Sequence, residues 1–139
     1  MAVQLSTAVR NARLDQIQTT IGTSAKLEIF SGSMPANCAA ATTGTKLAEF
    51  DLASSWAAAA SGGSKSLSGT PLSTTGASGA GSGTNAGYFR IFDNAGTTCH
   101  LQGTVTATGG GGDMTIDNVS IANGQTVNVT SFTLTDGNA

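Results

Sequence analysis

The chain has 139 residues, a formal net charge of −2, and only 10% charged residues. This length fits a single domain that can hold a core without metal or disulfide support. Nucleic-acid binding needs clustered Lys and Arg, and the six basic residues are scattered, so the composition argues against a nucleic-acid partner. No apolar run approaches the about 18 residues of a membrane span, which argues against a membrane partner.

The N-terminal stretch predicts a single short helix. Ser6 or Thr7 can cap its start, and Gly22 can end it in a left-handed conformation. A narrow apolar stripe at helical spacing is formed by Leu14, Ile17 and Ile21. We expect this helix to lie over an edge, either of its own sheet or of a neighbouring subunit. Residues 1–6 also lack the basic start and apolar core of a signal peptide, so we expect synthesis in a reducing cytoplasm.

Alternation of apolar and small polar residues predicts strands over much of the remaining chain. The strand-like runs are residues 26–30, 46–52, 65–70, 88–92, 98–107 and 126–135. Between them, residues 73–87 are rich in Gly, Ser, Thr and Ala and predict a mobile loop. The predicted fold is all-β, a two-layer, jelly-roll-like β-sandwich with a short N-terminal α-helix. We divide it into an arm and helix (1–24) and a single β-sandwich domain (25–139).

Turn chemistry and register refine this picture. Residues 93–96, Asp-Asn-Ala-Gly, fit a type I turn that joins two strands as a hairpin. A two-residue turn at Asn123–Gly124 would point the flanking apolar faces in opposite directions, which a half-buried hairpin does not tolerate. Either a three-residue loop (123–125) or strands in different sheets would resolve the conflict. A further phase slip predicts a bulge near Thr130–Ser131.

Few residues could take part in catalysis, and none of them belongs to a recognisable catalytic motif. His100, the single histidine, alternates outward, and no Gly-x-Ser-x-Gly elbow accompanies it. Glu49 and Asp51 share one strand face, a pattern typical of solvated surface rather than of a glycosidase pair. We therefore predict no enzymatic activity and no catalytic residue.

No metal or cofactor site is predicted either. A structural zinc site needs about four Cys or His ligands, and the chain has three in total. The cluster of Asp113, Asp117 and Asn118 lacks an EF-hand loop, so calcium binding is not expected. The glycine-rich runs lack the Lys-Ser/Thr of a phosphate loop. Cys38, in a loop, and Cys99, in a strand, are expected to be two free thiols, because cytoplasmic cysteines are kept reduced.

The ends of the chain carry a family resemblance. The opening Leu5–Asp15 (LSTAVRNARLD) and the closing Gly124–Leu134 (GQTVNVTSFTL) resemble small structural proteins encoded among the virion genes of tailed bacteriophages. The shared plan of helix, strand, Gly/Ala/Ser loops and Thr-rich β region covers nearly the whole chain. The resemblance is greatest to capsid decoration, or cement, proteins.

That resemblance implies a homo-oligomer, a dimer or a trimer, that sits on the capsid surface of the virion. Its partner would be the major capsid protein, whose shell it would stabilise without a cofactor. We hypothesise that the helix with its arm (3–21) and the strand 88–92 supply the contacts. The candidate interface residues are Arg10, Arg13, Leu14, Ile17, Tyr88, Arg90 and Phe92. The alternative is a tail or tail-fibre component, possibly glycan-binding, with Trp56 and Tyr88 as the rings that stack on sugar.

Overall fold

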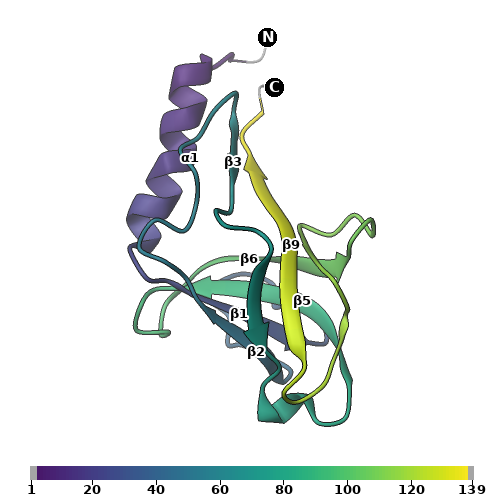
Figure 1. Cartoon of the computed structure of the whole chain (residues 1–139). Helices are drawn as coiled ribbons and strands as arrows, with labels where there is room; N and C mark the ends of the chain where they lie inside the picture. Colours follow the sequence, from purple (N-terminus) through teal and green to yellow (C-terminus); the bar gives the residue numbers. More distant parts are fainter. Residues whose placement is uncertain (1–2, 138–139) are drawn as a thin grey trace.

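A computed structural model describes residues 3–137, which form a curled mixed β-sheet and one short helix (Figure 1). This confirms the predicted all-β, sandwich-like fold with an N-terminal helix. The elements in chain order are α1 (Thr7–Ile21), β1 (Lys26–Ser31), β2 (Lys46–Asp51), β3 (Ser64–Ser66), β4 (Leu72–Thr75), the 3₁₀ turn η1 (Ser78–Ala80), β5 (Thr84–Phe92), β6 (Cys99–Ala107), β7 (Met114–Ile116), β8 (Ser120–Ile121) and β9 (Thr126–Thr135).

The strands follow one another around the sheet in the order β2-β1-β5-β6-β7-β9-β3, with β4 also paired to β9 and β8 to β5. The pairs are antiparallel except for β6 and β7, which are parallel. An isolated bridge between Ala48 and Gly76 brings the end of β4 back to β2, so the sheet curls round on itself. The chain thereby encloses its core between two layers of one sheet.

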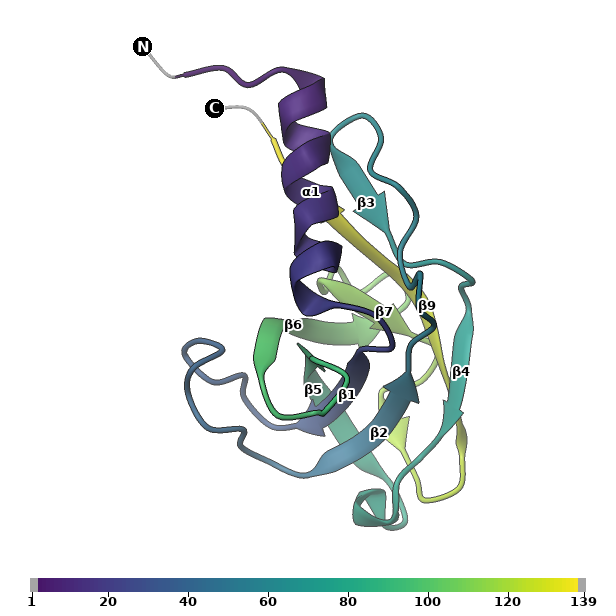
Figure 2. The same ribbon diagram turned by 90° about the vertical axis from the view of Figure 1, so that its left-hand side faces the viewer.

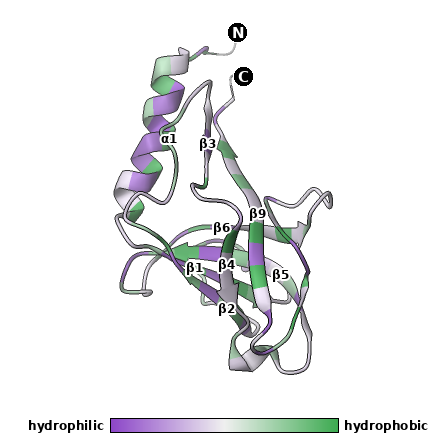
Figure 3. Cartoon of the chain, in the orientation of Figure 1, coloured by the Kyte–Doolittle hydropathy of each residue, from purple (hydrophilic) through white to green (hydrophobic). Residues whose placement is uncertain are grey.

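The core consists of the apolar faces that the alternation predicted. Leu27, Ile29, Phe89, Ile91 and Val129 are fully buried in it. Figure 3 shows hydrophobic and hydrophilic residues in successive bands along β9. A second, smaller cluster of Phe30, Tyr88 and Phe92 lies on the opposite face of β1 and β5.

Helix α1 has the ends that the sequence predicted. The Ser6 hydroxyl accepts a hydrogen bond from the Val9 amide at 3.2 Å, and Gly22 ends the helix with a φ of 92°. Leu14 and Ile21 are buried and Ile17 is half-buried, so the narrow stripe packs on the chain's own β domain. In Figure 2 the helix stands above β6, with β7 and β9 behind it.

The prediction of a mobile loop for residues 73–87 is wrong. The segment contains most of β4, the turn η1 and the start of β5. Its backbone is paired: Gly76 donates to the Gln125 carbonyl at 2.7 Å, and Ala77 donates to the Leu47 carbonyl at 2.8 Å. Small residues favour flexibility only where the backbone lacks partners, and here distant strands supply them. The strand predicted at 65–70 is shorter and earlier, at Ser64–Ser66.

The predicted turns are confirmed. Gly96 donates to the Asp93 carbonyl at 2.9 Å, closing the hairpin of β5 and β6. The register conflict at Asn123–Gly124 is resolved by different partners, since β8 pairs with β5 whereas β9 pairs with β3, β4 and β7. The bulge falls at Thr130, because Thr115 lies opposite Ser131 while its neighbour Ile116 lies opposite Val129.

Candidate functional site

The sheet is split between β6 and β9 at the end where helix α1 lies. β6 has nine residues and β9 has ten, but β7, which lies between them, has only three. β7 pairs with 105–107 of β6 and with 129–132 of β9. In the described part of the chain, no strand lies between 99–103 of β6 and 133–135 of β9. We call this region the β6–β9 slot.

Both strands turn backbone groups toward the slot. The Thr104 amide donates to the Asp113 carboxylate at 2.8 Å, on the side away from β5. Because N–H and C=O groups alternate in direction along a strand, the peptide groups of Gln102 also point away from β5. On β9, the Phe132 carbonyl accepts from Leu67 at 3.0 Å on the β3 side, so the peptide groups of Thr133 point the other way, into the slot. The slot therefore lies between two strand edges that face one another.

The floor of the slot is apolar and its rim is polar. The hollow has a volume of about 300 Å³ where α1 meets β9 and about 430 Å³ between the two strands. Its apolar floor between the strands is formed by Phe89, Leu101, Phe132 and Leu134. Phe89 and Phe132 pack edge to face at 5.2 Å, while Leu101 and Leu134 stay half-exposed. The rim is formed by Gln102, Asp113, Thr133 and Thr135.

Helix α1 supplies the third side. Arg13 and Ile17 border the hollow beside Thr135 and a further hollow of about 220 Å³ beside His100. The predicted residues Arg13, Leu14 and Ile17 are therefore brought to the slot. Arg10 lies nearby, where its guanidinium donates to the Asp136 carbonyl at 2.9 Å, and the Arg13 Nε lies 3.3 Å from the Asp136 carboxylate.

The other predicted interface residues lie on the opposite face, inside the chain. Tyr88, Arg90 and Phe92 are 0%, 2% and 7% exposed. The loop of residues 32–45 covers them: the Tyr88 hydroxyl donates to the Thr43 carbonyl, and the Arg90 guanidinium donates to the Ala40 carbonyl at 3.0 Å. One face of β5 packs in the main core, and the opposite face makes a second contact. The second contact, however, is the chain's own loop, so these side chains offer little surface to a partner.

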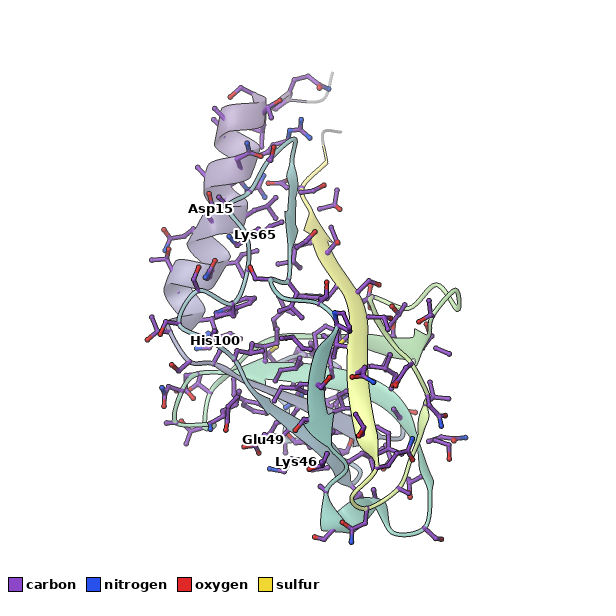
Figure 4. The ribbon with its side chains drawn as sticks, in the orientation of Figure 1. Asp15, Lys46, Glu49, Lys65 and His100 are labelled. Atoms are coloured by element: carbon purple, nitrogen blue, oxygen red, sulfur yellow. The ribbon has the colours of Figure 1, made fainter. Side chains whose placement is uncertain are left out.

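The remaining candidate residues, His100, Glu49 and Asp51, are not brought together. Figure 4 shows Lys46 and Glu49 at the lower part of the sheet, far from His100 near the base of α1. Lys46 lies 2.5 Å from Glu49, and its hydrogen bond lowers the pKa of that carboxyl, whereas burial raises the pKa of Glu28 on the neighbouring strand. Asp51 pairs with Lys26. This is a ladder of ion pairs on an open strand face.

The side chains that could bind a metal ion or stack on a sugar are also occupied by contacts within the chain. The carboxylates of Asp113 and Asp117 accept hydrogen bonds from Thr104 and Asn128, respectively. Among residues 3–137 no three His, Cys, Asp or Glu side chains are grouped as a metal would require. Trp56 is 2% exposed and donates to the Gly22 carbonyl at 3.2 Å, so neither Trp56 nor Tyr88 presents a ring for stacking on sugar.

Sequence reasoning missed the β6–β9 slot. One signal for it was available: residues 114–116 form a short apolar run between a glycine run and Asp117, next to two much longer alternating runs. A strand this short cannot cover two neighbours of nine and ten residues.

No protein-family model, curated protein or solved structure matches this chain. Within the described residues, the one α-helix lacks the length and hydropathy needed to cross a bilayer.

Proposed function

We propose that this chain is a non-enzymatic structural protein of a tailed-bacteriophage virion. In this proposal it is a decoration, or cement, protein that binds the major capsid protein on the capsid surface and stabilises the shell. The β6–β9 slot is the observation that supports a binding role most directly. The family resemblance of residues 5–15 and 124–134 supports the virion as the place where binding occurs.

The slot has the chemistry needed to receive an extended segment of a neighbouring protein. Neighbouring strands lie about 4.8 Å apart, so two strands separated by one missing strand leave about 10 Å between them. An incoming strand would pair with Gln102 on one side and Thr133 on the other, and its apolar side chains would cover Leu101 and Leu134. Strand addition of this kind obtains affinity from main-chain hydrogen bonds and specificity from side-chain pockets.

The surface composition supports a stable assembly. Only 10% of residues are charged, so electrostatic repulsion between copies is weak. Helix α1 presents Val9, which is 46% exposed, outside its buried stripe. We propose that this side of α1 contributes to contacts between copies in a dimer or trimer.

The experiment measures occupancy of the shell. Capsids that lack this protein are incubated with the purified wild-type chain or with Leu134→Asp, and the copies bound per particle are counted after sedimentation. We expect Leu134→Asp to lower the apparent affinity at least tenfold, because a carboxylate would be buried against the incoming strand. Leu134 is half-exposed, so the variant should keep its fold, which circular dichroism checks.

Met34→Asp provides the matched control. Met34 is also an exposed apolar residue, at 39%, but it belongs to the loop on the opposite face. Its substitution should leave occupancy unchanged. Full occupancy by folded Leu134→Asp would contradict the role of the slot. Labelled protein that binds tails in few copies, and not the shell, would contradict the capsid assignment and support a tail component.

A further inference from the structure

The fold brings Cys38 and Cys99 together, although they are far apart in the sequence. The loop of residues 32–45 is tied to the outer face of β5 and β6 by side chains of the sheet. Gln102 donates to the Pro35 carbonyl at 2.7 Å. These contacts hold the loop over the start of β6, where Cys99 lies.

Arg90 fixes the part of the loop that carries Cys38. Its guanidinium donates to the carbonyl of Asn37 at 3.1 Å and to that of Ala40 at 3.0 Å, on either side of Cys38. Arg90 also donates to Gln102 at 2.9 Å, so loop and strand share one buried cation. The cysteine position in the loop is therefore set by the sheet and not by the loop alone.

Cys99 faces the same side. It lies opposite Phe92 in the β5–β6 ladder and packs against the cluster of Phe30, Tyr88 and Phe92. Its thiol lies near enough to that of Cys38 for the neighbouring thiol to help raise its pKa, after the larger effect of burial. Both cysteines are free and partly exposed. The two thiols are thus neighbours on this face without a bond between them.

We propose that Cys38 and Cys99 form an intramolecular disulfide when the protein passes from a reducing to an oxidising glutathione pool, and that this bond fastens the loop of residues 32–45 to β6. This site does not depend on the proposed virion function. It goes beyond that function, since it assigns a covalent modification to the face opposite the β6–β9 slot.

The chemistry is thiol–disulfide exchange with oxidised glutathione. Burial is the main cause that raises the pKa of the Cys99 thiol to about 12, so at neutral pH Cys99 keeps its proton. In the first step the Cys38 sulfur attacks glutathione disulfide, which forms a mixed disulfide and releases one glutathione. Cys99 then loses its proton and attacks the Cys38 sulfur, which expels the second glutathione. Two electrons pass from the protein to glutathione disulfide, and the two thiol protons end on the two glutathione products.

The bond should stabilise the fold because it closes a long loop of the unfolded chain. We expect the oxidised protein to melt about 10 °C above the reduced protein. The effect should concentrate in residues 32–45, where amide hydrogen exchange should slow.

The test uses the full-length chain equilibrated in glutathione buffers of decreasing reducing strength. Free thiols are alkylated after denaturation and counted by mass spectrometry, and a non-reducing digest identifies the linked peptides. We expect both free thiols to be lost together, and the product to be a monomer in which Cys38 is linked to Cys99. Dithiothreitol should restore both thiols and remove the gain in melting temperature.

Two variants control the geometry. Cys38→Ser should leave one titratable thiol and no shift in melting temperature on oxidation. Cys38→Ala combined with Ala39→Cys keeps a thiol in the same loop but moves it by one residue, and it should form the bond at least tenfold less readily. The proposal is overturned if both wild-type thiols remain titratable in oxidised glutathione. It is equally overturned if the bond forms only between molecules, or if the shifted thiol oxidises as readily.

Discussion

Lys65 on β3 is 3% exposed, and its ammonium nitrogen lies 2.7 Å from the Asp15 carboxylate of helix α1 (Figure 4). The same ammonium donates to the Ala58 carbonyl at 2.8 Å, and Asp15 also accepts from the Ala60 amide at 2.9 Å. One ion pair therefore joins the helix, β3 and the segment that leads to β3. Together with the contacts of Asn11 and Arg10, it holds α1 beside the β6–β9 slot.

Removing Asp15 should lower the melting temperature more than removing Lys65. Asp15→Ala leaves the buried Lys65 ammonium without its counter-ion, so we expect the melting temperature to fall by about 5 °C or more. Lys65→Met removes the charge and keeps an apolar side chain of similar length, so the fall should be smaller. Calorimetry of both variants checks this order, and an equal or larger loss in Lys65→Met would contradict it.

Acid should destabilise the protein through its hydrogen-bonded carboxylates. The pKa is lowered in the folded state for Asp15, Asp93, Asp113, Asp117 and Glu49. For Asp113 the main cause is the hydrogen bond from the Thr104 amide. A lowered folded pKa gives stability that is present above the unfolded pKa, about 4, and is lost as pH falls through the folded pKa. Burial raises the pKa of Glu28 and acts in the opposite direction.

Urea unfolding between pH 6 and pH 2.5 tests this expectation (the pH values bracket the reference pKa of Asp, about 3.9). The wild-type midpoint should fall below about pH 4. Asp113→Asn should be less stable at pH 6 and should lose less on acidification, because it lacks one of the titrating groups. A variant curve parallel to that of the wild type would show that Asp113 does not contribute.

Gly87 on β5 should not tolerate a side chain. A Cβ at this position would lie 2.0 Å from the carbonyl oxygen of Gly32, a backbone atom that cannot turn aside. Gly87→Ala should therefore lower the free energy of unfolding by about 1–3 kcal/mol, the usual range for overpacking, in urea titrations. Gly137→Ala is the matched control, because a Cβ there meets nothing within 4 Å. Equal stability of the two variants would contradict the close approach of the loop to β5.

Arg90 should control the order of the loop that covers the outer face. Arg90→Met removes the donors to the Asn37 and Ala40 carbonyls and to Gln102. We expect a loss of about 3 kcal/mol in unfolding free energy and faster amide exchange in residues 32–45. Arg13→Met provides the control, since the Arg13 side chain is 60% exposed. Unchanged exchange in the loop of Arg90→Met would contradict this role.

Local patterns in the sequence determined much of this protein. The cap at Ser6, the stripe of Leu14 and Ile21, the Asp93–Gly96 turn and the bulge at Thr130 all depend on neighbouring residues or on strand phase. Such features depend on interactions between residues close together in the sequence, so they can be predicted without knowing the tertiary structure. The alternation that fills the core of β9 belongs to the same class.

Tertiary structure alone decided the candidate sites. The β6–β9 slot exists because a three-residue β7 lies between two longer strands, and no local pattern states which strands become neighbours. Arg90 and Tyr88 were predicted to contact a partner, yet a loop some 50 residues earlier in the chain buries both (the Arg90–Ala40 contact spans 50 residues). Residues 73–87 looked mobile, but β9 and β2 pair with their backbone. Contacts between distant segments depend on how the sheet curls, and periodicity along the chain carries no information on that.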